Sequence, residues 1–172
     1  MIKVSFKKLT LQSVAPVKAH PTDAGFDLTA ITKEVTEDYI EYDTGISIKL
    51  PKKHCGLLLP RSSNSNKDLL LCNSVGLIDE DYTGSLRFRF KRTTKTFKTI
   101  FKSFWWFSKL KKVPIELKEY EVGDKIGQLV ILPIPEIELV EEQELPITSR
   151  GTNGFGSTDK PKPNNSRKKK IN

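Results

Sequence analysis

The sequence predicts an all-β protein with a single domain, and three observations support this prediction. Most apolar runs are short and end at Gly, Pro, Asn or Asp, which is typical of strands separated by turns. Few stretches repeat their apolar residues at the helical spacing of 3.6. A length of 172 residues suits one core and would be cramped for two domains. Many short strands at this spacing favour a sandwich, a jelly roll or a small barrel.

The expected strands follow from the apolar runs and the residues that interrupt them. Prolines at 51, 60, 133, 135 and 146 fall at the edges of runs, where a missing backbone donor does least harm. The first run alternates apolar and polar residues and lacks the apolar block of a signal peptide. In chain order the expected strands are 2–9, 26–30, 39–50, 55–59, 69–75, 85–90 and 125–132.

One stretch, 93–112, departs from this pattern and lies within an expected insert at 91–118. It carries aromatic residues at helical spacing beside lysines, which favours a basic amphipathic helix. A hairpin is the alternative, because Phe and Trp also favour strands. The apolar positions are Phe97, Ile100, Phe101, Phe104 and Trp105, and the lysines beside them are Lys98, Lys102 and Lys109.

The net charge of +8 is unevenly distributed. Residues 91–112 and 160–172 are rich in Lys and Arg and contain no acid, whereas the remainder of the chain is mildly acidic. We expect a main domain at 1–148, a glycine-rich arm at 149–159 and a disordered basic tail at 160–172, which cannot bury enough apolar surface to order itself. The run 167–170 is either a nuclear signal or a solvated charged end.

Cysteine and histidine usage argues against disulfides and zinc. Cys55 and Cys72 make no ligand cluster, and we expect both to be reduced thiols. His20 and His54 lack metal-ligand spacing, so any metal should be one that prefers oxygen ligands. No apolar run has the length needed to span a bilayer, and we expect a cytoplasmic protein, with a nuclear location left open.

Several polar residues stand where chemistry is possible. Asp79 follows two apolar residues, so it is either a general base held by a rigid strand or part of a solvated acidic turn. Asp27 and Gln128 lie among apolar neighbours and would need buried partners. Arg61 begins a hydroxyl-rich segment that could bind phosphate or form a polar loop. Glycines at 151, 154 and 156 would let backbone amides approach phosphate oxygens.

Taken together, these segments resemble the motifs of the trimeric dUTP nucleotidohydrolases, the dUTPases. The resemblance runs in order through "AGFDL", "DTGISIKLP", "PRSSNSNKDLLLCNSVGLIDEDYTG", "GDKIGQLV" and "RGTNGFGST". It implies an all-β jelly-roll fold of the β-clip type and a homotrimer whose active sites combine residues of different subunits. It also implies Mg²⁺-assisted hydrolysis of dUTP to dUMP and pyrophosphate, which limits uracil in DNA and supplies dUMP for dTMP synthesis.

The resemblance also implies roles for individual residues. Asp79 would activate the attacking water, and Asp27 would contact waters of the Mg²⁺ ion. Tyr82 would pack on the deoxyribose and exclude a 2′-hydroxyl, and Phe155 would stack on uracil. The implied substrate-binding residues are Arg61, Ser62, Ser63, Asn73, Gly76, Ile78, Tyr82, Gln128, Arg150, Phe155, Gly156, Ser157 and Thr158.

The chain departs from the family pattern at three single positions and in the insert. Ser63 stands where many members have Gly, Gly127 where Ala is common, and Asp159 where the last motif usually has Gly. The insert resembles in position the extra segment of some phage dUTPases that bind repressor proteins. A regulatory protein that binds a protein partner through 93–112 is therefore one alternative function, and a dCTP deaminase or bifunctional relative is another. A membrane surface or nucleic acid is a further alternative partner for the insert.

Overall fold

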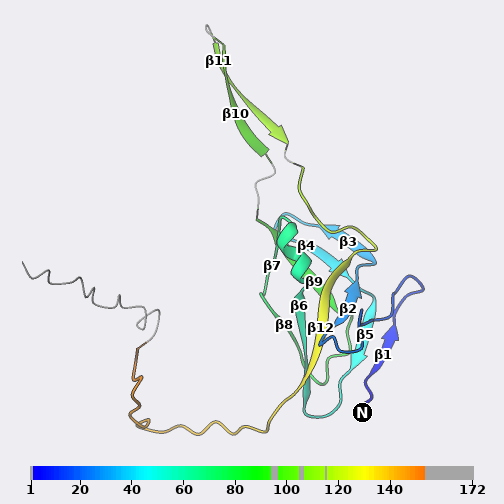
Figure 1. Ribbon diagram of the computed structural model, residues 1–172, viewed down its shortest axis with the longest axis vertical. Helices are drawn as coiled ribbons and strands as arrows, with labels where there is room; N and C mark the ends of the chain where they lie inside the picture. Colours follow the sequence, from blue (N-terminus) through cyan, green and yellow to red (C-terminus); the bar gives the residue numbers. More distant parts are fainter. Residues whose placement is uncertain (1, 94–96, 105–106, 115, 154–172) are drawn as a thin grey trace, which may run out of the picture. The chain divides into compact units, whose positions relative to one another are not determined.

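The computed structural model describes residues 2–93, 97–104, 107–114 and 116–153. Two four-stranded sheets form the main body, and the expectation of an all-β fold is confirmed (Figure 1). One sheet has the order β2 (Phe26–Thr29), β12 (Lys125–Pro133), β6 (His54–Pro60) and β8 (Gly76–Ile78). The other has the order β3 (Thr32–Val35), β4 (Ile40–Asp43), β9 (Arg87–Arg92) and β7 (Leu69–Leu71).

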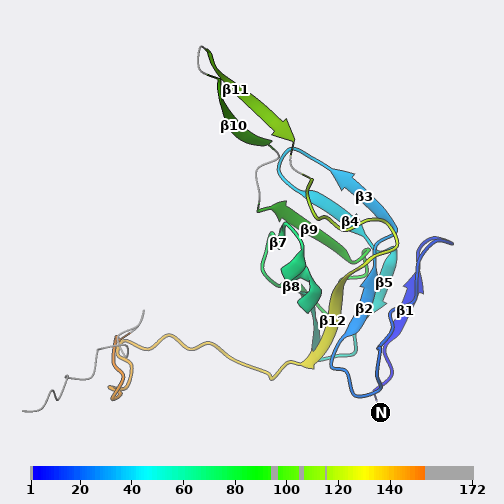
Figure 2. The same ribbon diagram turned by 45° about the horizontal axis from the view of Figure 1, so that its top comes forward.

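Two further elements complete the body. Strand β1 (Ser5–Lys8) pairs with β5 (Ile46–Lys49) as a separate antiparallel ribbon, which Figure 2 shows beside the sheets. A short 3₁₀ helix, η1 (Ser62–Asn66), follows β6 directly. Within the described residues no helix has the length and apolar character that a membrane crossing requires.

The core lies between the two sheets and joins them into one body. Strands β4 and β9 alternate buried and exposed residues, as half-buried strands do. A single apolar cluster contains residues of both sheets and of β5. Its fully buried side chains include Leu28, Ile126 and Leu129 from one sheet, Ile40, Tyr42, Phe88 and Phe90 from the other, and Ile46 from β5.

One glycine sets the distance between the sheets. A Cβ atom at Gly127 in β12 would lie 2.2 Å from the ring of Phe88 in β9. The Phe88 ring therefore packs directly on the backbone of the opposite sheet. The departure from the usual Ala at this motif position has a physical reason, because Phe88 occupies the space that an Ala methyl would need.

The expected strand 39–50 is wrong as one strand. Gly45 has a φ of +61° and breaks the run into β4 and β5. A Cβ there would lie 2.3 Å from the Ser13 hydroxyl oxygen, so both conformation and space require glycine. The apolar alternation continues across this corner, which is why the sequence pattern did not reveal it.

The expected strand 69–75 is also shorter than predicted. Its first part, β7, pairs with β9, and the chain then crosses to the other sheet, where β8 pairs with β6. Ser74 takes a left-handed conformation at this crossing, with a φ of 59°. Strands β3 and β8 were missed because each is short and carries little apolar alternation.

The expected helix in the insert is wrong. Residues 97–114 form an antiparallel hairpin of β10 (Phe97–Phe104) and β11 (Phe107–Pro114), paired from Phe97 with Pro114 to Phe104 with Phe107. Phe97, Thr99 and Phe101 occupy every second position in the first part of β10, and such residues favour strands. Pairing two equal halves also satisfies the backbone groups that a helix would otherwise satisfy. The joining residues 105–106 lie outside the described residues.

The chain separates into two compact units, 1–136 and 137–172, and the second is described only as far as residue 153. In the second unit, residues 148–153 form a turn that Gly151 closes by donating to the Thr148 carbonyl at 3.1 Å. Ile137, Leu139, Val140, Leu145 and Ile147 are all largely exposed in this unit. The expected basic tail, 160–172, lies outside the described residues.

Candidate active site

A buried carboxylate, Asp27, is the centre of one polar cluster. It lies in β2, where its side chain points into the body and is 3% exposed. Oδ1 accepts hydrogen bonds from Arg61 Nε at 3.0 Å and from Gln128 Nε2 at 3.1 Å. Oδ2 lies 2.9 Å from Lys125 Nζ. The pairing of β2 with β12 sets Gln128 opposite Asp27, so the sheet itself positions these residues.

The partners of Asp27 keep it ionised. Burial by itself raises its pKa, but hydrogen bonds from Lys125 and Gln128 and the positive charge of Arg61 outweigh burial. The net pKa of Asp27 is below its ordinary value. Two cations facing one carboxylate leave a net positive charge in this cluster. Sequence reasoning missed Lys125, although its position directly before the buried Ile126 could have drawn attention to it.

The segment that follows Arg61 is held by a tyrosine of the chain returning from the hairpin. Ser62 and Ser63 lie exposed in η1, directly beyond the Asp27 cluster. The Tyr120 hydroxyl donates to Asn64 Oδ1 at 3.2 Å, and Asn64 Nδ2 donates to the Leu69 carbonyl. Burial raises the pKa of Tyr120, so it remains a neutral donor. The hydroxyl-rich segment is therefore a fixed element rather than a loose polar loop.

A second cluster lies around the crossing from β7 to β8. Asn73 and Tyr82 line one hollow of about 500 Å³ together with Glu41, Cys72, Arg87 and Arg89. Gly76 lies against the Asn73 amide, because a Cβ there would be 3.5 Å from Asn73 Nδ2. Ile78 is buried in β8 as part of the apolar core. Cys72 and Cys55 are both free thiols, as the sequence predicts.

Asp79 follows β8 directly and begins a turn. Its carbonyl accepts a hydrogen bond from the Tyr82 backbone at 3.1 Å, and its side chain is exposed. Within the part of the chain that the structure describes, its carboxylate accepts no hydrogen bond. The next two residues are held by hydrogen bonds, because Lys49 Nζ donates to the Glu80 carbonyl and to Asp81 Oδ1. A rigid strand thus presents an accessible, unpaired carboxylate to solvent.

The structure brings the predicted site residues together as two groups. Among the described residues, no hydrogen bond or ion pair joins the Asp27 cluster to the group of Asn73, Asp79 and Tyr82. Arg150 belongs to the second unit, where its Nε donates to the Asn153 carbonyl at 3.2 Å. The predicted residues Phe155, Gly156, Ser157 and Thr158 lie outside the described residues.

The residues of this site suit a metal ion that is bound mainly by the phosphates of a ligand and by water. No group of three or more Asp, Glu, His or Cys side chains that could hold an ion is found among the described residues. Asp27 has its three short contacts filled by protein donors, but Oδ2 contacts only Lys125 and can still accept from a water. This fits Mg²⁺, which keeps several waters and binds phosphate oxygens.

Comparison with known proteins gives a consistent result. The family model described as dUTPase matches residues 12–101, more than half of the chain. A deoxyuridine 5′-triphosphate nucleotidohydrolase of Leifsonia xyli is 34% identical over 83% of this chain and 84% of its own length. A second one, from Clostridium novyi, is 33% identical over 91% of this chain and 99% of its own length.

Solved structures of phage proteins also resemble this chain. The Staphylococcus bacteriophage 80alpha dUTPase with dUPNHPP has a TM-score of 0.73 and 31% identity, covering 91% of this chain and 98% of its own. The description of that structure states that phage dUTPases control transfer of virulence genes. A mutant dUTPase from phage phi11 of S. aureus, described with a structural Mg(II) ion, has a TM-score of 0.61 and 25% identity, covering 84% of this chain and 99% of its own.

Proposed function

Because this chain belongs to the dUTPase family and is a dUTP nucleotidohydrolase that forms dUMP and pyrophosphate, we propose that Asp79 is its general base. The observation that supports this proposal is the exposed Asp79 carboxylate directly after strand β8, which accepts no hydrogen bond from the described residues. Asp79 would take a proton from the water that attacks the α-phosphorus, and the bond to the bridging oxygen of pyrophosphate would break. The alternative of a dCTP deaminase is not favoured by these relatives.

The Asp27 cluster is proposed to hold the triphosphate. Arg61 uses Nε for Asp27, and its other guanidinium nitrogens are free, among the described residues, to donate to phosphate oxygens. Ser62, Ser63 and Gln128 would add donors beside it. dUTPases use Mg²⁺, and the ion would neutralise charge on the phosphates, while Asp27 would accept from a water of the ion. Arg150, Gly156, Ser157 and Thr158 would close over the phosphates from the C-terminal arm.

The hollow beside β8 is proposed to bind the nucleoside. The Asn73 amide and the main chain from Gly76 to Ile78 would read the uracil edge, and Phe155 would stack on the base. Close approach to carbon 5 would exclude a thymine methyl. Tyr82 would lie on the deoxyribose and leave no room for a 2′-hydroxyl. The separation of the two groups on one chain supports a trimer in which one subunit supplies the hollow and another the phosphate cluster.

Asp79→Asn tests the proposed base. The substitution keeps size and removes the basic oxygen, so we expect turnover of dUTP to fall by about 10² to 10⁴ while nucleotide binding persists. Pyrophosphate release and binding of a non-hydrolysable dUTP analogue measure the two effects. Asp81→Asn, an exposed acid of the same turn, is the control and should keep most activity. Near-normal turnover in the Asp79 variant would exclude this role.

The hairpin is a second functional element, and we propose that it binds a protein partner with an acidic surface. Its strands pair only with each other among the described residues. The segment 91–112 is rich in Lys and Arg and contains no acid, and Lys98, Lys102, Lys109 and Lys111 all belong to the two strands of the hairpin. Such a concentration of charge is unfavourable for folding alone and suits an acidic partner.

Replacing residues 94–115 by a short Gly-Ser linker tests the hairpin. We expect dUTP hydrolysis to be retained, because Arg92 and Glu119 at the base remain. We also expect loss of the partner in a pull-down compared with the full chain. Anionic vesicles and DNA serve as parallel probes. If the same proteins are recovered with and without the hairpin, the hairpin is structural. If the deletion removes binding only to vesicles or DNA, the partner is a membrane surface or nucleic acid and not a protein.

A further inference from the structure

The turn that carries Asp79 and Tyr82 lies along strand β5, and contacts from β5 hold it. The Leu86 backbone donates to the Ile46 carbonyl at 2.8 Å. Lys49 Nζ lies 3.0 Å from Asp81 Oδ1, but both side chains are largely exposed, so this ion pair contributes little. A third contact between β5 and the turn, in which the donor side chain is buried, contributes more.

That buried contact is made by Ser47. Its hydroxyl donates to the Thr83 carbonyl at 2.6 Å, and the residue is 9% exposed. The Thr83 carbonyl accepts no other hydrogen bond among the described residues. Without the hydroxyl, the Thr83 carbonyl would lose the one hydrogen-bond donor that the described residues give it, and this part of the turn would be held less firmly. Thr83 directly follows Tyr82, so a shift of this part of the turn moves Tyr82.

The ring of Tyr82 is itself packed tightly on the same turn. A Cβ at Gly84 would lie 2.7 Å from Tyr82 Cζ, and the Tyr82 hydroxyl donates to the Ser85 carbonyl at 3.0 Å. The ring is thus fixed to the backbone of residues 84–85. Its position relative to the body depends on two anchors of this turn, the Ser85 hydroxyl, which donates to Asp43 Oδ1, and the Thr83 carbonyl, which accepts from Ser47.

We propose that Ser47 is a positioning residue that sets the discrimination between deoxyribose and ribose, acting through the Thr83 carbonyl on Tyr82. This rests on the proposed role of Tyr82 in excluding the 2′-hydroxyl. Ser47 touches neither substrate nor metal. Its hydroxyl holds the turn so that Tyr82 stays close to carbon 2 of the sugar, and loosening the turn admits UTP.

The test compares kcat/KM for dUTP and UTP by pyrophosphate release. In S47A the ratio should fall about tenfold, the effect of one lost hydrogen bond to backbone, mainly through faster UTP hydrolysis. In S47C the side chain has a similar volume but is a weak donor, so the ratio should fall in the same way. S47T keeps the hydroxyl and should restore the ratio. An unchanged ratio in a folded S47A or S47C protein overturns the proposal.

Ser13→Ala is the matched control. Ser13 is also buried, and its hydroxyl donates to the Gly45 carbonyl at 2.8 Å rather than to the turn that carries Tyr82. It should lower thermal stability without changing the ratio, and an equal change in S13A would also overturn the proposal. Tyr82→Ala separates the premise from the inference. If Y82A keeps the ratio, the role of Tyr82 fails, and if only Y82A lowers it, the role of Ser47 fails.

Discussion

Gly127 and Phe88 show how one position can serve both packing and the site. Gly127 directly precedes Gln128, which donates to Asp27, and its missing side chain gives space to the Phe88 ring of the opposite sheet. The close approach of the two sheets therefore occurs beside the proposed phosphate cluster. A residue that enlarges this position would push the strand that carries Gln128 and Lys125 away from the core.

Gly127→Ala is expected to destabilise the protein. The added methyl would overlap the Phe88 ring, and overpacking of this kind typically costs about 1–3 kcal/mol. Chemical denaturation gives the free energy of unfolding. The double variant Gly127→Ala with Phe88→Leu should recover part of the loss, since the smaller side chain makes room. A single variant as stable as the wild type would contradict this packing.

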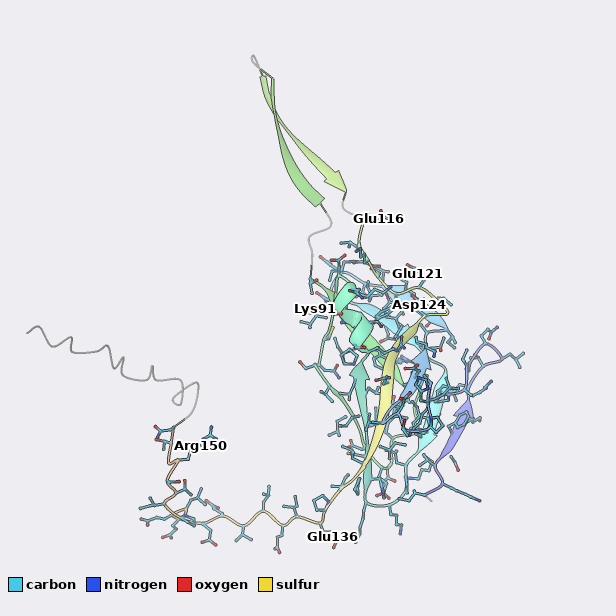
Figure 3. All side chains as sticks on the ribbon, viewed as in Figure 1. Lys91, Glu116, Glu121, Asp124, Glu136 and Arg150 are labelled. Carbon is cyan, nitrogen blue, oxygen red and sulfur yellow. The ribbon has the colours of Figure 1, made fainter. Side chains whose placement is uncertain are left out.

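At the scale of elements, the base of the hairpin is joined to the proposed phosphate segment. Figure 3 shows Lys91, Glu116, Glu121 and Asp124 at the end of the body where the chain leaves β9 and returns. Glu119, on the returning chain, lies 2.7 Å from Arg92 Nε and 3.1 Å from Lys33 Nζ. The next residue, Tyr120, holds Asn64 of η1. Two successive residues, Glu119 and Tyr120, therefore connect the base of the hairpin to η1.

The same contacts make stability depend on pH. Burial raises the pKa of Glu119, but hydrogen bonds from Arg92 and Lys33 outweigh it, and the net pKa is below the ordinary 4.5. A depressed pKa means that Glu119 stabilises the fold above about pH 4.5 and that this contribution is lost as pH falls through the lower folded value. This pH dependence arises from the contacts of Glu119 with Arg92 and Lys33, so a variant of Glu119 should distinguish it from the effects of other carboxylates.

Glu119→Gln is expected to lower the free energy of unfolding by about 1–3 kcal/mol at neutral pH, because Arg92 and Lys33 lose a partly buried charged partner. The difference from wild type should shrink as pH falls below 4.5. Denaturation at several pH values measures it. Glu116→Gln, an exposed neighbour, should show little effect at any pH. A difference that stays constant on acidification would contradict this assignment.

At the scale of the whole molecule, the proposed site is divided. Asp79 and Tyr82 follow β8, while Asp27 of β2 contacts Arg61, directly after β6, and Gln128 of β12. No described hydrogen bond or ion pair links the groups. The glycine-rich arm belongs to the second compact unit, which also carries exposed apolar residues. This division agrees with the proposal that the active site is completed by residues of more than one copy of the chain.

Mixed trimers test this division. Asp79→Asn and Arg61→Ala chains should each be nearly inactive as homotrimers. Unfolding and refolding them together should restore about a quarter of wild-type activity, because a site between unlike subunits can combine an intact Asp79 with an intact Arg61. Size-exclusion chromatography confirms assembly, and mixing folded trimers without refolding is the control. No recovery in assembled mixed trimers would indicate that each chain forms its own site.

The sequence by itself determined the all-β class, most strand positions, the reduced cysteines and, through its motif order, the family and activity. These features depend on local sequence or on the order of motifs, so they can be predicted without knowing which strands pair. It did not reveal the corner at Gly45, the crossing at Ser74, the hairpin in place of a helix, or Lys125 beside Asp27. Only the tertiary structure decided these, because they depend on which strand pairs with which and on the space between the sheets. Ser47 shows the same physical reason, since its partner Thr83 lies 36 residues away in the chain.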